Sequence, residues 1–121
     1  MPKKNFYEIL GVSHQATEAE IIATYLKLRR ELIASNSPVE EFQKIYEAVL
    51  VLTQIRETYD LADEQEDFHT VVPGKTLDEF LNEDDTKTAA EIQAAKIQNE
   101  NLEKYRKKKE QLRQFSSESN N

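Results

Sequence analysis

The chain has 121 residues, enough for one ordinary domain with an appendage, and its formal net charge is −7. It has no Cys, which excludes disulfides, thiolate chemistry and Cys-rich zinc sites. The acidic balance argues against general nucleic-acid binding, because that needs a basic surface to displace counterions. The first residues lack the apolar run of a signal peptide, and no stretch approaches the ~20 apolar residues of a membrane span. We therefore expect a cytoplasmic protein without a membrane span.

Helix starts are predicted from capping boxes, in which a Ser or Thr caps the helix and a Glu three residues later returns the hydrogen bond. The sequence has four such pairs: Thr17 with Glu20, Ser37 with Glu40, Thr76 with Glu79, and Thr88 with Glu91. The second is the best formed, because Pro38 takes the first helical position. The predicted helices cover, in chain order, residues 6–10, 18–34, 38–60, 77–82 and 89–114.

Apolar side chains recur at helical spacing in the helices predicted at 18–34 and 38–60, so each should bury one face. These side chains are Ile21, Tyr25, Leu28 and Leu32 in the first, and Phe42, Ile45, Val49, Leu52 and Tyr59 in the second. Because only a short turn separates the two helices, we expect an antiparallel hairpin. The short helix at 6–10 can close one side of it. The predicted fold class is all-α.

Charge and composition divide the chain into four parts. Residues 1–62 form a near-neutral helical domain, and residues 63–87 form an acidic connector that contains a short helix. Residues 88–115 form a mildly basic C-terminal helix, and residues 116–121 should be disordered. The connector has nine Asp and Glu against two Lys.

Catalytic, cofactor and metal sites find little support in the sequence. The only histidines are His14, in a loop, and His69, in the acidic connector, and both are expected to be solvated. The acidic runs at 63–67 and 82–85 lack the Gly-centred spacing of a calcium loop, which favours a solvated linker. With only two Gly, the chain has no glycine-rich phosphate loop. We expect no catalytic residue, no cofactor and no metal.

Two stretches resemble a J domain, the helical module of DnaJ-type co-chaperones. "NFYEILGVSHQATEAEIIATYLKL" is similar to the opening of that module, and "EEFQKIYEAVLVL" followed by "RETYD" is similar to its third helix and closing segment. The similarity covers residues 5–62, about half of the chain. It implies an antiparallel helical hairpin with short flanking helices.

The resemblance to a J domain does not extend to the tripeptide on which the family's activity depends. In J domains a His-Pro-Asp sequence at the hairpin loop is required to stimulate ATP hydrolysis by a DnaK-type chaperone. Aligned without a gap on Tyr25 and Leu28, its position falls on Ile33, Ala34 and Ser35. Ile has no hydrogen-bonding side chain, and Ser cannot supply a carboxylate. The resemblance therefore implies the fold and argues against the usual activity.

The second helix also departs from the family pattern, in which basic residues along its outer face meet the acidic surface of the chaperone. Here that face is largely apolar, with some positive charge kept. The residues predicted to bind a partner are Ile22, Leu26, Lys27, Arg29, Arg30, Ile33 and Leu50. The alternative is that a rotation of the helix or local repacking buries the apolar ones in the domain's own core.

Two covers for this apolar stripe can be proposed from the sequence. One is a second copy of the domain, in a two-fold symmetric dimer. The other is the connector, whose apolar residues are Phe68, Val71, Val72, Leu77, Phe80 and Leu81. We favour the connector, because tethering gives it a high effective concentration. Arg29 and Arg30 would then lie near some of its acidic residues.

The leading functional prediction is a non-catalytic J-like interaction module or adaptor, which binds a chaperone, a J-domain protein or its own copy without stimulating a DnaK-type ATPase. The first alternative is a pseudo-J regulator that pairs with a functional J-domain protein. The second is a surface-binding protein that uses the basic C-terminal helix on membrane or nucleic acid, and added salt should weaken such binding.

Overall fold

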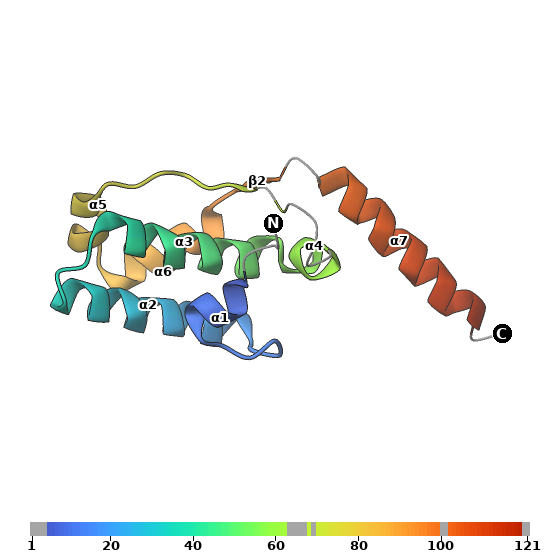
Figure 1. The fold of residues 1–121 in the computed structure, drawn as a ribbon, viewed down its shortest axis with the longest axis horizontal. Helices are drawn as coiled ribbons and strands as arrows, with labels where there is room; N and C mark the ends of the chain where they lie inside the picture. Colours follow the sequence, from blue (N-terminus) through green and yellow to red (C-terminus); the bar gives the residue numbers. More distant parts are fainter. Residues whose placement is uncertain (1–4, 63–67, 69, 100–101, 120–121) are drawn as a thin grey trace.

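The computed structural model describes residues 5–62, 68, 70–99 and 102–119. The acidic run at 63–67 and His69 lie outside this part of the chain. The helices are α1 (Phe6–Leu10), α2 (Glu18–Ala34), α3 (Val39–Gln54), α4 (Arg56–Leu61), α5 (Leu77–Asn82), α6 (Asp85–Ala94) and α7 (Leu102–Ser119). Strands β1 (Thr70–Val71) and β2 (Gln98–Asn99) pair antiparallel, with Thr70 opposite Asn99. The all-α prediction is confirmed, with this two-residue ladder as an addition (Figure 1).

Helices α2 and α3 form the predicted antiparallel hairpin, against which α1 packs. The predicted stripes face each other in its core, where Tyr25 and Phe42 are fully buried. The ring centroids of Tyr25 and Tyr46 lie 6.2 Å apart across the hairpin. Leu52 is buried, whereas Leu28 is half-buried at the edge of the same core. Apolar periodicity therefore located the buried face of each helix.

The closing segment joins the end of the hairpin to α1. The predicted helix 38–60 is interrupted at Ile55, and α4 follows as a separate short helix. The Tyr59 hydroxyl accepts a hydrogen bond of 3.0 Å from the backbone N–H of Phe6. The Tyr7 hydroxyl donates to Asp60 at 2.6 Å, and burial together with this bond raises the pKa of Tyr7 to about 12. The closing segment is thus tied to α1 at both Phe6 and Tyr7.

Arg56 fixes the loop between α1 and α2. Its guanidinium donates to the Tyr7 hydroxyl at 3.1 Å and to the carbonyl oxygens of Ala16 and His14 at 2.6 and 2.5 Å. His14 was expected to be a solvated side chain, and it is exposed, but its ring stacks on Tyr7 with 4.2 Å between centroids. The "RETYD" segment therefore works by tying α4 to the start of the domain.

The turn between α2 and α3 corrects one predicted cap. Asn36 is left-handed at φ 54°, and its N–H donates to the Ile33 carbonyl, while the Ser37 N–H donates to the Leu32 carbonyl. This pair of bonds is a Schellman motif, which ends α2 and uses Asn as one of the few non-Gly residues that tolerate this backbone. The predicted Ser37 cap is wrong: α3 starts after Pro38 without a side-chain cap. The Ser37 hydroxyl instead lies 2.9 Å from that of Ser35.

We expect Thr17 and Ser37, the two predicted caps on either side of α2, to respond differently to replacement by Ala. The Thr17 hydroxyl accepts from the Glu20 N–H at 3.1 Å, so Thr17→Ala should cost about 0.5–2 kcal/mol of unfolding free energy. Ser37→Ala removes no cap bond and should change stability by less than about 0.5 kcal/mol. Urea unfolding of both variants measures this, and equal losses would contradict the assignment.

The single helix predicted at 89–114 is also corrected. Helix α6 begins earlier, where the Asp84 carboxylate accepts from the Lys87 N–H at 2.7 Å, and it ends at Ala94. Thr88 is therefore not a cap but a buried position inside α6. The chain then passes through β2 before α7 begins, and α7 continues to Ser119 through residues that were expected to be disordered. The capping box at Thr76 is confirmed in both of its bonds.

Candidate interaction surface of the helical hairpin

The chain after the hairpin folds back over it, so that α5 and α6 pack on α3, and α6 also packs on α2 (Figure 1). Phe80 of α5 and Ile92 of α6 are fully buried in the same core as the hairpin. The Phe80 ring stacks on Phe42 at 5.3 Å between centroids and meets Tyr46 edge-on at 5.7 Å. The hairpin core therefore extends into a layer supplied by residues beyond the J-like segment.

This layer covers most of the apolar stripe that was predicted to bind a partner. Ile22 and Leu50 are buried and Leu26 is half-buried, all three in the core that contains Ile92. These side chains therefore lie in the chain's own core and not on an open partner-binding surface, which agrees with the expectation that another segment of the same chain covers the stripe. The chain's own covering segment was predicted as residues 63–87, whereas much of the cover comes from α6.

The connector contributes less cover than its composition indicated. Phe80 is fully buried, and Phe68 and Val72 pack partly buried against the core. Val71, Leu77 and Leu81 are exposed instead.

Arg29 is the charged group that α6 encloses, and its side chain is only 4% exposed. Its guanidinium lies 2.8 Å from the Asp85 carboxylate and donates to the Thr88 hydroxyl at 2.5 Å. Arg30, on the exposed side, pairs with the second oxygen of the same carboxylate. The hydrogen bond from Arg30 and the charges of both guanidinium groups hold the pKa of Asp85 below its ordinary value. The prediction that these arginines meet connector acids is confirmed at Asp85.

Lys75 forms a second buried charge cluster, and its side chain is 3% exposed. Its ammonium lies 2.5 Å from the Glu83 carboxylate and 2.7 Å from that of Glu91. The rings of Tyr46 and Phe80 flank the ammonium at 5.1 Å each, a distance at which a cation is attracted to an aromatic face. This cluster joins α3, α5 and α6 through one side chain.

Side chains of α3 hold the Lys75 segment and the end of α6 by hydrogen bonds. The Gln43 amide donates to the Lys75 carbonyl at 3.0 Å, and the Thr70 hydroxyl donates to Glu47 at 3.1 Å. At the end of α6, the Gln54 amide donates to the Ile92 carbonyl at 2.6 Å. The segment from Thr70 to α6 is thus fixed to α3 at several points along its length.

Tyr25 and Tyr46 offer a matched pair of hydroxyls inside this layer. Burial and then the charge of Glu91 raise the pKa of Tyr46, whose hydroxyl donates to Glu91 at 3.2 Å. The Tyr25 hydroxyl is buried without a hydrogen-bond partner among the described residues. We expect Tyr46→Phe to cost about 0.5–1.5 kcal/mol and Tyr25→Phe to be neutral or stabilising, since it removes an unpaired buried group. Thermal unfolding measures both, and a larger loss for Tyr25→Phe would contradict this pairing.

The remaining predicted partner-binding residues lie on the surface. Lys27 is exposed on α2, and Ile33 is 36% exposed at its end. Ala34 and Ser35 complete the last turn of α2, and the Ser35 hydroxyl donates to the Glu31 carbonyl of the same helix. Ile33, Ala34 and Ser35 therefore belong to a helix end rather than to an open loop.

Sequence reasoning did not predict that Lys75 is buried and pairs with Glu83 and Glu91. It also did not predict the hydrogen bond from Arg29 to Thr88, which was expected to be a helix cap. The acidic composition of the connector was the only signal. A Lys with acidic neighbours in the sequence is normally expected to be exposed to solvent. Only the three-dimensional structure shows that Lys75 is buried.

Within the described ranges, no group of three or more His, Asp or Glu side chains is placed to hold a metal ion. The same part of the chain contains no helix with both the length and the apolar character that crossing a bilayer requires.

Comparison with known proteins agrees with the fold of the hairpin. The family model of the DnaJ domain matches residues 5–60. The chain is similar to three proteins named "Chaperone protein DnaJ". That of Clostridium tetani is 45% identical over 67 residues, that of Hydrogenobacter thermophilus 39% over 66, and that of Deinococcus proteolyticus 37% over 67. No solved structure matches the chain.

Each similarity covers 50% of this chain and only 18%, 18% and 22% of the respective relatives, so the match spans about a fifth of their length. Helices α5, α6 and α7 lie beyond the residues that the family model matches. DnaJ domains are non-catalytic co-chaperone modules that bind DnaK-type chaperones. The family match and the α1–α3 arrangement together identify residues 5–60 as a DnaJ domain.

Proposed function

We propose that the chain is a non-catalytic adaptor built on a DnaJ domain, which binds a protein partner without stimulating the ATPase of a DnaK-type chaperone. The observation that carries the proposal is the identity of Ile33, Ala34 and Ser35 at the position of the His-Pro-Asp tripeptide. None of these three side chains is acidic or carries an imidazole. The Ser35 hydroxyl donates to the Glu31 and Leu32 carbonyls of its own helix.

The covered face of α2 supports the same proposal. In the family pattern, basic residues on this helix meet an acidic surface of the chaperone. Here Asp85 already pairs with Arg29 and Arg30, so an acidic partner would have to compete with a tethered carboxylate. Arg29 is also enclosed by α6 and cannot reach a partner unless α6 leaves the hairpin. Two independent features thus oppose the usual activity.

The ATPase rate of a DnaK-type chaperone tests the proposal. With the full chain added at micromolar concentration, the single-turnover rate should stay unchanged, whereas a functional DnaJ protein in a parallel sample should raise it several-fold. Stimulation of several-fold by this chain would refute the proposal.

A second arm of the same experiment separates the adaptor from a pseudo-J regulator. Here the chain is titrated into a mixture of the chaperone and the functional DnaJ protein. An adaptor for other partners should leave the stimulated rate unchanged. A concentration-dependent fall in that rate would identify the chain as a regulator of functional J-domain proteins instead.

A further inference from the structure

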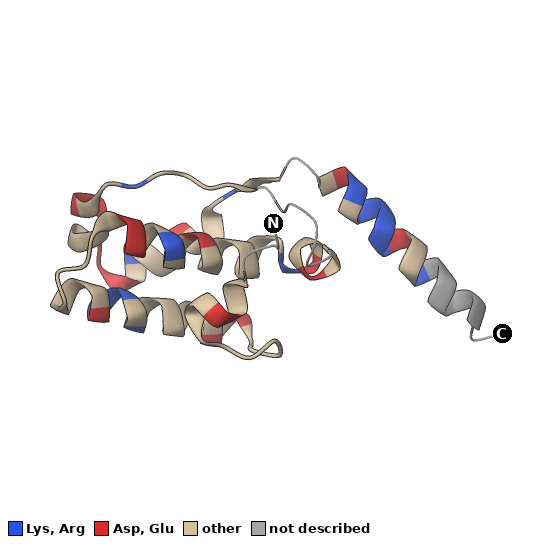
Figure 2. Cartoon of the chain, viewed as in Figure 1, with Lys and Arg blue, Asp and Glu red and all other residues tan. Residues whose placement is uncertain are grey.

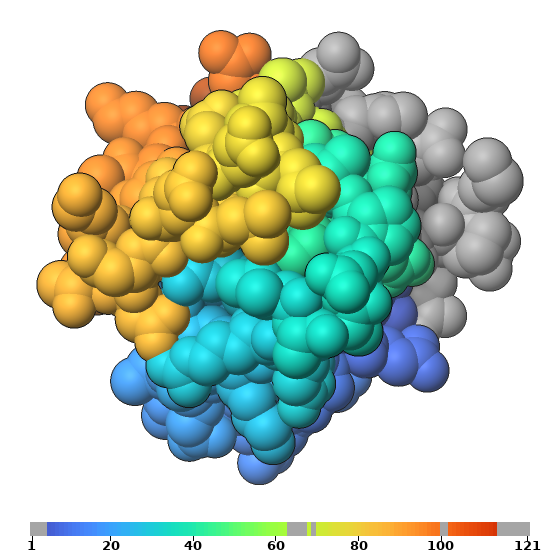
Figure 3. All heavy atoms as spheres, turned by 90° about the vertical axis from the view of Figure 1, so that its left-hand side faces the viewer, coloured from blue at the N-terminus to red at the C-terminus, as the bar shows by residue number. Residues whose placement is uncertain are grey.

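An apolar groove lies at the end of the body, between the α2–α3 turn and α5. Three of the five large hydrophobic side chains exposed in the described part of the chain line it, namely Ile33 at 36%, Leu77 at 36% and Leu81 at 42%. The groove has a volume of about 120 Å³, several times the ~30 Å³ share of one water molecule. It has room for an apolar side chain from outside. Figure 3 shows this end, with the α2–α3 turn in cyan to green and α5 in yellow.

The surroundings of this groove, which we call the tip, are strongly acidic. Residues 29–41 and 75–85 together hold eight Asp and Glu against three basic residues, Arg29, Arg30 and Lys75. Arg29 and Arg30 both pair with Asp85 and Lys75 pairs with Glu83, so a net negative charge remains around the groove. Asp78 and Glu79 are exposed on α5 beside the groove. The tip therefore suits a partner that presents an apolar side chain among basic ones.

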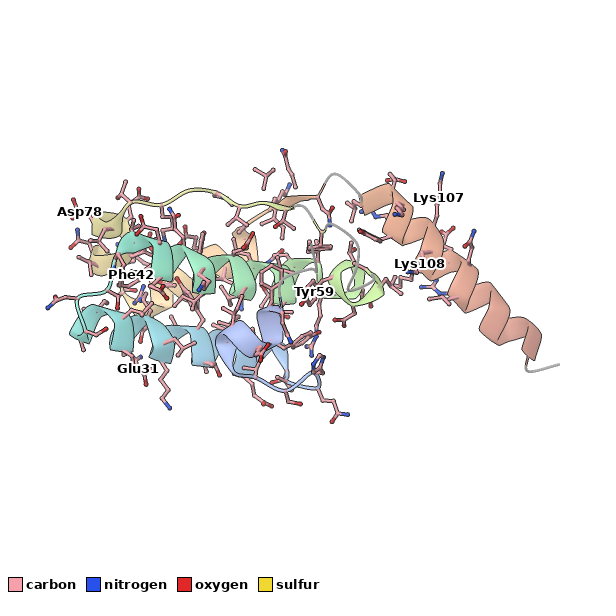
Figure 4. The ribbon with its side chains drawn as sticks, in the orientation of Figure 1. Glu31, Phe42, Tyr59, Asp78, Lys107 and Lys108 are labelled. Carbon is pink, nitrogen blue, oxygen red and sulfur yellow. The ribbon has the colours of Figure 1, made fainter. Side chains whose placement is uncertain are left out.

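Helix α7 presents that combination at the other end of the molecule. Residues 102–113 hold six Lys and Arg against two Glu. Leu112 is 51% exposed. Among the described side chains of α7, it is the only large hydrophobic one that is exposed. Figure 2 shows the basic residues along α7, and Figure 4 shows Lys107 and Lys108 at the opposite end of the molecule from Asp78.

The face of α7 that carries Leu112 is already a binding face within the chain. One turn earlier, Lys108 donates to the Leu61 carbonyl at 2.9 Å and Lys109 pairs with Glu57 of α4. Tyr105, on the same face by its spacing of seven residues, is buried and lies 5.9 Å from the Phe68 ring. Beyond α4 the helix projects from the body (Figure 1). Leu112 follows Lys109, which pairs with α4, by three residues and is exposed.

We propose that α7 of one copy docks its Leu112 face into the acidic tip of a second copy. The tip and α7 lie at opposite ends of the molecule, so the α7 of one chain cannot bind the tip of that same chain (Figure 1). Because the two surfaces differ, the contact is heterologous, and each pair leaves one tip and one α7 unoccupied. Head-to-tail chains grow with concentration as a result. Added salt weakens them, since the charges around the contact are exposed to solvent.

The test is sedimentation of the full-length protein and of variants blocked at either end. Leu81→Asp places a further negative charge in the groove, and Leu112→Asp places one on the docking face of α7. Val71→Asp makes the same change at an exposed site away from both surfaces and serves as the control. Circular dichroism checks that each variant is folded, and Leu77→Asp, on the same groove, replaces Leu81→Asp should that variant unfold.

The wild type and Val71→Asp should show a weight-average mass that rises with concentration above the 14.1 kDa of one chain. Leu81→Asp and Leu112→Asp should each stay at the mass of one chain. Their equimolar mixture should reach twice that mass and no more, because one variant keeps its α7 and the other keeps its tip. A monomeric wild type, continued association of either variant alone, or a mixture that stays monomeric would overturn the proposal.

Discussion

Replacement of Ile92 by Ala is expected to lower the free energy of unfolding by about 2–5 kcal/mol, the usual loss for a fully buried large aliphatic residue. Ile92 belongs to α6, outside the matched DnaJ domain, yet it is fully buried in the same core as Ile22 and Leu50. Its truncation leaves a cavity that the packed helices fill only in part. Urea unfolding followed by circular dichroism measures the loss.

Gln93 is the matched control, because it is exposed at the next position of α6. Gln93→Ala should change the unfolding free energy by less than about 0.5 kcal/mol. A single unfolding transition for Ile92→Ala would mean that α6 and the hairpin unfold together. If Ile92→Ala cost no more than Gln93→Ala, α6 would not be part of the core.

Replacement of Lys75 by Met should produce the second large effect. Met keeps the apolar contacts with the Tyr46 and Phe80 rings but removes the charge that both Glu83 and Glu91 face. Breaking a fully buried pair costs about 3–5 kcal/mol, but these carboxylates are 27% and 35% exposed, so we expect about 1–3 kcal/mol. Lys87→Met, at an exposed site of α6, is the control and should be nearly neutral.

The pH dependence of this loss provides an independent check. Burial opposes the charge on Glu83, but the hydrogen bond and charge of Lys75 outweigh it and hold the pKa of Glu83 below its ordinary value of 4.5. A lowered pKa in the folded state stabilises the fold above the ordinary value, and this contribution is lost as pH falls through the folded pKa. The difference in unfolding free energy between wild type and Lys75→Met should therefore be constant near neutral pH. It should become smaller as the pH falls below 4.5. A difference that stayed constant to pH 3 would contradict the ion pair.

Local signals in the sequence predicted those features that depend on neighbours along the chain. The caps at Thr17 and Thr76 are confirmed, and each hydroxyl accepts from the backbone N–H three residues later along the chain. The cap at Ser37 fails because the left-handed Asn36 turns the Ser37 N–H back to α2. An Asn two residues before Pro was the available signal for this turn.

Features that depend on distant residues could not be predicted in the same way. Thr88 has the sequence of a cap, but its hydroxyl accepts from Arg29, which lies 59 residues earlier. The break between α6 and α7 has no Gly or Pro to mark it, and it coincides with the pairing of β2 with β1. The apolar stripe on α2 predicted that some segment must cover it. Which segment does so is decided by how Phe80 and Ile92 fit the hairpin, and composition does not show this.

Native-state hydrogen exchange of α6 tests most directly whether the chain's own helix closes the hairpin face. If it does, the backbone amides of residues 89–94 should exchange about as slowly as the buried amides of α3, because both open only when the common core opens. Exchange of these α6 amides many-fold faster than those of α3, at the rate of a fraying helix, would show that α6 leaves the hairpin readily. Arg29 and the stripe beneath α6 would then be open to a chaperone, contrary to the account given above.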